Sequence, residues 1–181
     1  MGAKKMTKRL QIAVIGSAGP EEYSKAKPNA AMYQSAEELG KLLASKNCIV
    51  INGGKGGVME AVCRGAQQNG GITVAEVSGN KRFTANAFVD VEIVTCDVGF
   101  RGPSQLIGMS DGVIAIGGGA GTLQELAVAY RMQKPVVLLT GFGGWTDRIA
   151  ALKYMDEREL IALTKAVTPQ NAVQQILEMV R

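Results

Sequence analysis

The stretch that decides the fold is Gly112-Val-Ile-Ala-Ile-Gly-Gly-Gly-Ala-Gly-Thr-Leu-Gln-Glu125. Residues 112–116 are apolar without interruption, which is typical of a strand buried on both faces. Beyond the glycines, apolar residues follow the i, i+3, i+4, i+7 spacing of one helix face, at Leu123, Leu126, Ala127 and Tyr130. The glycines therefore form a strand-to-helix turn. Because uncovered backbone N–H groups at a helix N-terminus attract anions, the turn predicts a phosphate site.

Strand and helix patterns alternate along the whole chain. Continuous apolar runs, as in parallel sheets covered on both faces, are separated by segments with helical periodicity. Strands are predicted at residues 10–15, 48–51, 72–75, 91–95, 112–116, 135–139 and within 160–166. Helices are predicted at residues 29–46, 58–68, before 109, at 122–132, from about 147, and from Thr168-Pro169 to about 180. We expect an α/β fold, a three-layer α-β-α sandwich around a mostly parallel sheet of about 6–7 strands.

The composition limits the classes of function. Residues 1–9 hold four of the 20 basic residues and no acid, so residues 10–181 carry 16 basic and 16 acidic residues. We therefore expect a basic tail followed by a single neutral domain, without a nucleic-acid surface. The absence of histidine excludes Ser-His and Cys-His nucleophiles and histidine-bound metals. Three cysteines without CxxC spacing predict neither a zinc site nor disulfides, which indicates a cytoplasmic protein. No apolar run is long enough for a membrane span.

Turns of glycine or other small residues follow four of the predicted strands, at residues 16–19, 53–57, 117–121 and 141–144. The carboxyl ends of parallel strands lie along one edge of the sheet, and ligands bind beyond that edge. We therefore expect the four turns to converge on one rim of the sheet.

Two common phosphate sites do not fit these turns. A dinucleotide fold would place Gly-x-Gly-x-x-Gly after the first strand and an acid after the second. This chain has Gly16-Ser-Ala-Gly-Pro20 and Ile51-Asn-Gly53 at those places. A P-loop requires Ser or Thr after its lysine, whereas Lys55 is followed by two glycines. NAD, FAD and P-loop ATP sites are therefore not predicted.

Two motifs together resemble a known family. The first is Asn52-Gly-Gly-Lys-Gly-Gly-Val-Met-Glu60, and the second is Gly117-Gly-Gly-Ala-Gly-Thr-Leu-Gln-Glu125. The pair is similar to the signature of a Rossmann-like group once labelled "lysine decarboxylase-like", which includes the LONELY GUY phosphoribohydrolases and the molybdenum-cofactor carrier proteins. The resemblance runs from the first strand to Gly143-Gly-Trp-Thr-Asp-Arg148 and is nearer to the carrier branch. Lysine decarboxylation is not predicted, because it requires pyridoxal phosphate in a much larger fold.

The resemblance implies the residues that hold a phosphorylated ligand. The second motif would cradle the phosphate, and the first motif and first turn would line the same cleft. The implied binding residues are Gly16, Ser17, Gly53, Gly54, Lys55, Gly56, Gly57, Gly118, Gly119, Gly121 and Thr122. In the hydrolases the acid that ends the second motif and an upstream arginine are catalytic, which implies Glu125 and Arg101 here. A carboxylate is suited to stabilise the positive charge that develops at C1′.

The sequence leaves two classes of function open. Arg101 is followed by Gly102-Pro103 and not by the lysine of the hydrolases, so we expect a binding or carrier protein. Its ligand would be the molybdenum cofactor (molybdopterin) or a nucleotide monophosphate, with no cofactor required. The alternative is a nucleoside 5′-monophosphate phosphoribohydrolase. The resemblance also implies a homodimer or dimer of dimers, with no nucleic-acid or membrane partner.

Several site residues also have a purely structural interpretation. Thr122-x-x-Glu125 fits a capping box, in which the two side chains satisfy N–H groups at a helix start. Asn86 and Asp90 either contact the ligand or organise turns. Cys63 is expected to be a buried, inert thiol. Ligand selectivity is expected in residues 77–90, 97–105 and 142–145.

Overall fold

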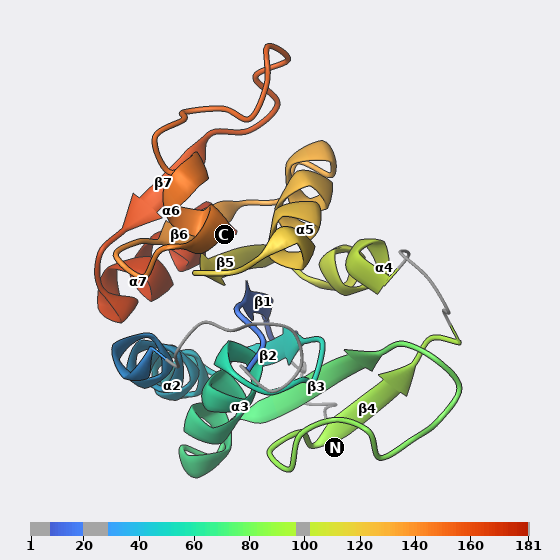
Figure 1. Ribbon diagram of the computed structural model, residues 1–181. Helices are drawn as coiled ribbons and strands as arrows, with labels where there is room; N and C mark the ends of the chain where they lie inside the picture. The colour runs from blue at the N-terminus through green and yellow to red at the C-terminus, as the bar shows by residue number, and fades with distance from the viewer. Residues whose placement is uncertain (1–7, 20–28, 97–101, 181) are drawn as a thin grey trace, which may run out of the picture.

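The computed structural model describes residues 8–19, 29–96 and 102–180, and the structural statements below concern these residues. They form a seven-stranded parallel sheet in the order β4-β3-β2-β1-β5-β6-β7 (Figure 1). The strands are β1 (Gln11–Gly16), β2 (Ile49–Asn52), β3 (Ile72–Val77), β4 (Val91–Val94), β5 (Gly112–Ile116), β6 (Val136–Leu139) and β7 (Leu163–Ala166). The predicted Rossmann-like sandwich is confirmed, and every strand pair is parallel.

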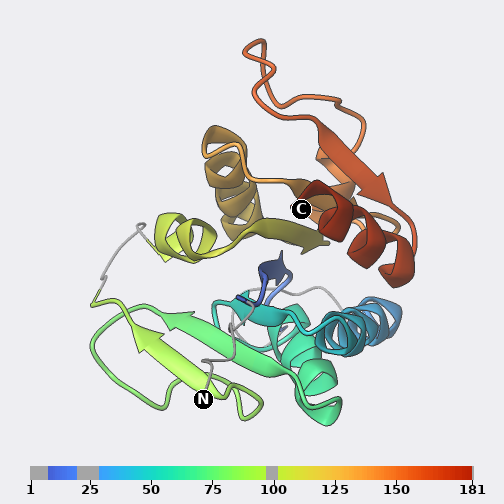
Figure 2. The ribbon, with the colours of Figure 1, turned by 180° about the vertical axis from the view of Figure 1, so that it is seen from behind.

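Helices cover both faces of the sheet (Figure 1; Figure 2). One face packs against α2 (Ala30–Ser45), α3 (Val58–Gln68) and α7 (Pro169–Met179). The other packs against α4 (Gly102–Met109), α5 (Ala120–Arg131) and α6 (Gly144–Ile149). Because both faces are covered, β5 and β6 are buried at every residue, as their continuous apolar sequences predicted. No helix in the described part of the chain is both long and apolar enough to span a bilayer.

The helix starts follow from their caps. Asn29 accepts a hydrogen bond from the Met32 N–H at the start of α2, and Thr168 caps α7 ahead of a proline at the first helical position. Helix α5 begins two residues earlier than predicted, with Gly119 as its N-cap and no side-chain cap. Thr122 therefore lies inside the first turn, and its hydroxyl donates to the Gly16 carbonyl (3.2 Å). The capping-box interpretation of Thr122 is thus wrong, because the helix begins before it.

The sheet reverses its winding at β1. This central strand pairs with β2 on one side and with β5 on the other, so the chain runs outward in both directions from it. Such a reversal opens a crevice at the carboxyl ends of the strands, where ligands of open α/β sheets bind. The glycine turns after β1, β2 and β5 all end at this crevice.

Candidate functional site

A cavity of about 580 Å³ lies at the carboxyl ends of the central strands. Its volume is in the range of small-molecule sites. Its walls come from the turns after β1 and β2, the end of β3 with the loop that follows, and the first turns of α4 and α5. The lining residues are Gly16, Ala18, Gly53, Lys55, Met59, Glu76, Val77, Ser78, Thr84, Gly102, Pro103, Leu106, Gly121, Thr122 and Glu125.

The N-terminus of α5 forms part of the cavity wall through Gly121 and Thr122. The first backbone bond inside this helix runs from the Leu123 N–H to the Gly119 carbonyl (3.1 Å). The N–H groups of Ala120, Gly121 and Thr122 precede it and therefore have no partner within the helix. Since the N-cap Gly119 has no side-chain cap bond either, these donors and the positive end of the helix dipole face the cavity in the arrangement that favours an anion.

The turn before α5 is held from two sides. From the turn after β1, the Ser17 hydroxyl accepts a hydrogen bond from the Gly118 N–H (2.8 Å). From α6, the N–H groups of Trp145 and Thr146 donate to the carbonyls of Gly118 (2.9 Å) and Gly117 (3.0 Å). Ser17 and Gly118 therefore position the turn and do not line the cavity.

The fourth glycine turn, at residues 141–144, supports the site from behind. A Cβ on Gly144 would lie 2.6 Å from the Gly117 carbonyl carbon, and the φ of Gly144 is +71°. Only glycine allows this close approach of two backbones. The four turns therefore converge on one rim of the sheet as predicted, although residues 141–144 are absent from the cavity lining.

The first motif folds tightly against the turn after β1. Gly57 is the N-cap of α3 with φ +70°, and a Cβ there would lie 2.5 Å from the Ser17 carbonyl oxygen. The buried Asn52 side chain accepts from the Gly54 N–H (2.8 Å), which fixes the start of the turn. Of this motif's predicted glycines, only Gly53 lines the cavity, together with Lys55. The other glycines, Gly54, Gly56 and Gly57, shape the turn.

The loop after β3 contributes walls as well as structural contacts. Ser78 and Thr84 line the cavity, and the role of residues 77–90 in ligand selectivity stays a prediction. Asn86 does not: its side-chain amide donates to the carbonyls of Gly54 (3.1 Å) and Lys55 (3.0 Å). Asp90 accepts from the backbone N–H (2.8 Å) and hydroxyl (2.9 Å) of Thr73. The structural interpretation of Asn86 and Asp90 is therefore confirmed.

Two carboxylates face the cavity, and only one was predicted. Glu125 projects from α5 and is partly buried; burial raises its pKa to about 7, with a further contribution from Glu76 and an opposing one from Lys55. Glu76 lies near the end of β3 and is 5% exposed, with its Oε1 accepting from the Thr95 hydroxyl (2.6 Å). The sequence analysis missed Glu76. The available signal was an acid near the carboxyl end of an otherwise apolar strand.

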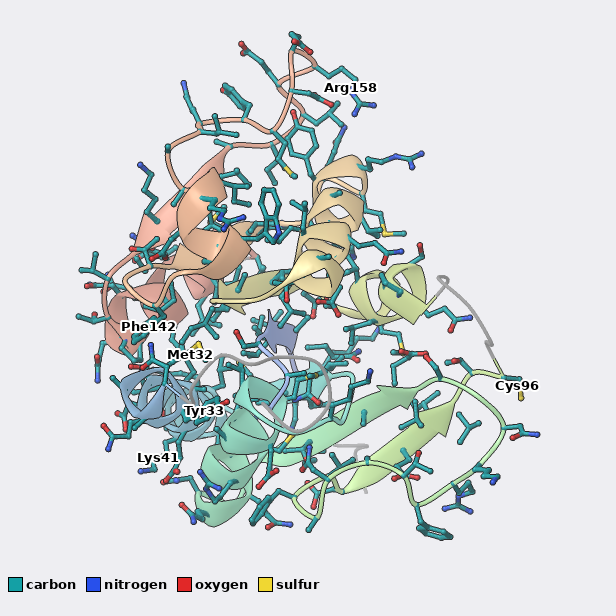
Figure 3. All side chains as sticks on the ribbon, viewed as in Figure 1. Met32, Tyr33, Lys41, Cys96, Phe142 and Arg158 are labelled. Atoms are coloured by element: carbon teal, nitrogen blue, oxygen red, sulfur yellow. The ribbon has the colours of Figure 1, made fainter. Side chains whose placement is uncertain are left out.

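The remaining predicted residues fall outside the cavity or outside the described residues. Arg101, the implied catalytic arginine, lies outside the described residues, whereas the next two residues, Gly102 and Pro103, line the cavity. Residues 142–145 do not line it: Phe142 packs against the apolar cluster that contains Met32 (Figure 3). The prediction that this segment selects the ligand is therefore not supported by its position.

The site has no reactive thiol and no metal centre among the described residues. Burial raises the pKa of Cys63 to about 11, and its sulfur accepts from the Asn52 side chain (3.1 Å), as expected for an inert core thiol. No three potential His, Cys, Asp or Glu ligands gather in the described part of the chain in a way that would hold a metal ion.

The chain is similar to solved structures of known proteins and matches the model of one protein family. The structure is similar to that of TM1055, a structural-genomics target (35% identity, TM-score 0.85, covering 93% of this chain and 99% of that one). It is also similar to the molybdenum cofactor binding protein of Rippkaea orientalis (27% identity, TM-score 0.80, covering 97% and 100%). A third similar structure is the molybdenum cofactor carrier protein of Chlamydomonas reinhardtii (29% identity, TM-score 0.77, covering 94% and 99%). A family model matches residues 9–173, and by this match the chain belongs to the SLOG cluster4 family.

Proposed function

We propose that this protein binds and carries a phosphorylated, nucleotide-like ligand whose phosphate lies at the N-terminus of α5. The observation that carries the proposal is the uncapped start of α5 in the wall of a cavity at the strand ends. Three N–H groups there lack a helical partner, and Lys55 adds a positive charge to the lining. The similarity to molybdenum-cofactor carriers supports the molybdenum cofactor, a phosphorylated pterin, as one such ligand.

The donor set suits the organic part of that ligand. Backbone N–H groups and a lysine favour a phosphate, and the carboxylates and hydroxyls favour a polar heterocycle. Since the described residues offer no cluster of metal ligands, we propose that the chain holds the pterin and phosphate, and that molybdenum arrives already bound to the ligand.

A thermal-shift screen of nucleoside monophosphates and molybdopterin tests the proposal. A ligand at about 100 times its Kd should add roughly 2.7 kcal/mol to the free energy of unfolding. For a chain of 181 residues this corresponds to a rise in Tm of roughly 5–10 °C. If no phosphorylated compound raises the Tm, the proposal is wrong.

One substitution tests the location of the phosphate. Ala120 is the first residue of α5, where proline is tolerated, so Ala120→Pro should remove one N–H donor without unfolding the helix. We expect unchanged Tm in the free protein and weaker binding of every phosphorylated ligand. Ala120→Ser, which keeps the N–H, is the matched control. Equal affinities for both variants would place the phosphate elsewhere.

A specific observation also favours the nucleoside 5′-monophosphate phosphoribohydrolase. Glu125 has a pKa of about 7, so it can take up or release a proton at neutral pH, as acid–base catalysis requires. Arg101 stays a prediction for this reaction. Incubation with AMP and with cytokinin monophosphates, followed by assay of the free base, tests the activity. Release that persists undiminished in Glu125→Ala would rule out the assigned role of Glu125.

We further propose that the protein acts in the cytoplasm as a homodimer or dimer of dimers. Three free cysteines, of which Cys48 and Cys63 are buried, support a reducing compartment, and the family resemblance supports the oligomer. Light scattering that shows a monomer at micromolar concentration would contradict the oligomer.

A further inference from the structure

The cavity is lined by the N–H-rich start of α5 and by two carboxylates, Glu76 and Glu125. One side is formed by the N-terminal turn of α5, which favours a negative group. The other side includes the side chain of Glu76, which is 5% exposed and extends from β3 toward the start of α4. Its Oε2 lies 3.2 Å from the position that a Cβ on Gly102 would occupy. Any side chain at residue 102 would therefore crowd the Glu76 carboxylate.

The Glu76 carboxylate is held in a fixed orientation. Its Oε1 accepts from the Thr95 hydroxyl (2.6 Å), and Thr95 is tied to β3 through its own N–H to the Val77 carbonyl (3.1 Å). Each carboxylate oxygen has room for a second hydrogen bond. The Glu76 carboxylate can therefore accept further hydrogen bonds from a ligand in the cavity that it lines.

An ionised carboxylate accepts hydrogen bonds and repels anions. The ligand's phosphate is therefore excluded from the Glu76 side, and whatever part of the ligand reaches Glu76 must donate hydrogen bonds. Two adjacent N–H donors in a plane match the two oxygens of one carboxylate. This arrangement exists on heterocycles that carry a ring N–H beside an exocyclic amino group.

We infer that Glu76 determines the specificity of the cavity by accepting two hydrogen bonds from the 2-amino-4-oxopyrimidine edge of the phosphorylated ligand. This inference rests on the proposed function, because it assumes a phosphate at α5. Guanine and pterin rings share that edge, whereas adenine and hypoxanthine lack its donor pair. Glu125, Ser78 and Thr84 line the remaining wall and contact other parts of the ligand.

Binding of three nucleotides to two variants tests the inference. GMP offers the ring N–H and the amino group, IMP lacks the amino group, and XMP has a carbonyl oxygen in its place. The wild-type protein should bind GMP more tightly than IMP and XMP, on the order of tenfold to a hundredfold, the discrimination typical of a bidentate pair. Glu76→Gln has nearly the same shape, and its amide can donate to the carbonyl of XMP. In this variant GMP should weaken by a similar factor and XMP should strengthen.

Glu157→Gln is the matched control, because it removes the same charge from an exposed residue remote from the lining. It should leave the affinities for GMP, IMP and XMP unchanged. The inference is supported if Glu76→Gln alone binds XMP more tightly than GMP, because the loss of a purely structural carboxylate would not change which base is preferred.

Three other results would overturn the inference. If Glu76→Gln weakens all three nucleotides equally and lowers the Tm, Glu76 only anchors Thr95 beside β3. If the wild-type protein binds GMP, IMP and XMP with equal affinity, the base is not recognised at Glu76, while the phosphate proposal stands. If none of the three binds and Ala120→Pro changes no affinity for molybdopterin either, the proposed phosphate site fails and the inference fails with it.

Discussion

Glu125 offers a quantitative test of the cavity's electrostatics. In the folded protein its pKa is raised to about 7, primarily by burial and then by Glu76, whereas the ordinary value is 4.5. Between pH 4.5 and about pH 7, Glu125 keeps its proton in the folded protein but has released it in the unfolded chain. Stability from this group therefore decreases as the pH rises through that window. Glu125→Gln has no proton to lose, so it should escape this decrease.

The expected magnitude follows from the two pKa values. Between about pH 5 and about pH 8, the raised pKa lowers the wild-type free energy of unfolding by about 2.5 kcal/mol, as an order of magnitude. The assay is urea unfolding of wild type and Glu125→Gln at both pH values. Any constant effect of the amide cancels when the two differences are subtracted, as do the titrating groups that do not interact with Glu125. We therefore expect the variant to gain about 2.5 kcal/mol over wild type between the two pH values.

The control is Glu157→Gln, whose difference from wild type should be the same at both pH values. If Glu125→Gln also shows no change with pH, Glu125 has an ordinary pKa and the described burial of its carboxyl is wrong. The acid–base argument for the hydrolase would then lose its basis. Glu76→Gln should produce part of the same effect, because removal of the neighbouring carboxylate lowers the pKa of Glu125.

Three further predictions concern stability and reactivity. Gly144→Ala should destabilise the protein by about 3 kcal/mol, because the new Cβ would collide with the backbone of Gly117 and displace the hydrogen bonds that Trp145 and Thr146 donate to this turn. The control is Gly70→Ala, which has a similar φ of +68° but open space around it and should cost only about 1 kcal/mol. Equal losses of stability in urea unfolding would refute the close approach of the two backbones. Asn52→Ala should cost about 1–3 kcal/mol by leaving the buried Gly54 N–H unsatisfied, and an unchanged Tm would contradict this. A thiol reagent at neutral pH should label the exposed Cys96, which lies just beyond the carboxyl end of β4 (Figure 3), well before the buried Cys48 and Cys63. Cys96→Ser should remove the fast phase of labelling. A fast phase that persists in this variant would show that a buried thiol is accessible.

The strands and most helices were predictable from the sequence because their patterns are local. Residues 112–116 and 58–68 were predicted with the bounds that the structure has, since apolar runs and helical periods are read within one segment. The Thr168-Pro169 start of α7 was also correct, because a cap and the proline that follows it lie side by side in the chain. The start of α5 was not, because glycine at an N-cap leaves no side-chain signal.

Part of the cavity lining was predicted, and the contacts that support it from behind were not. Gly121, Thr122 and Lys55 line the cavity as expected, because a glycine turn between strand and helix carries its chemistry in the backbone. The roles of Ser17, Gly118 and residues 141–144 as supports depend on contacts between segments far apart in the sequence. No local pattern distinguishes a glycine that faces a ligand from one that faces another backbone.

By itself, the sequence determined that this protein has a parallel α/β sheet, and it predicted an anion site after the fifth strand, since both follow from short-range periodicity and glycine placement. Only the tertiary structure decided that Glu76 faces Glu125 across one cavity. Their carboxylates come from β3 and α5, on opposite sides of the central strand, and the reversal of strand order at β1 brings them together. The raised pKa of Glu125 depends on that juxtaposition and on burial, both of which are properties of packed neighbours and not of a segment.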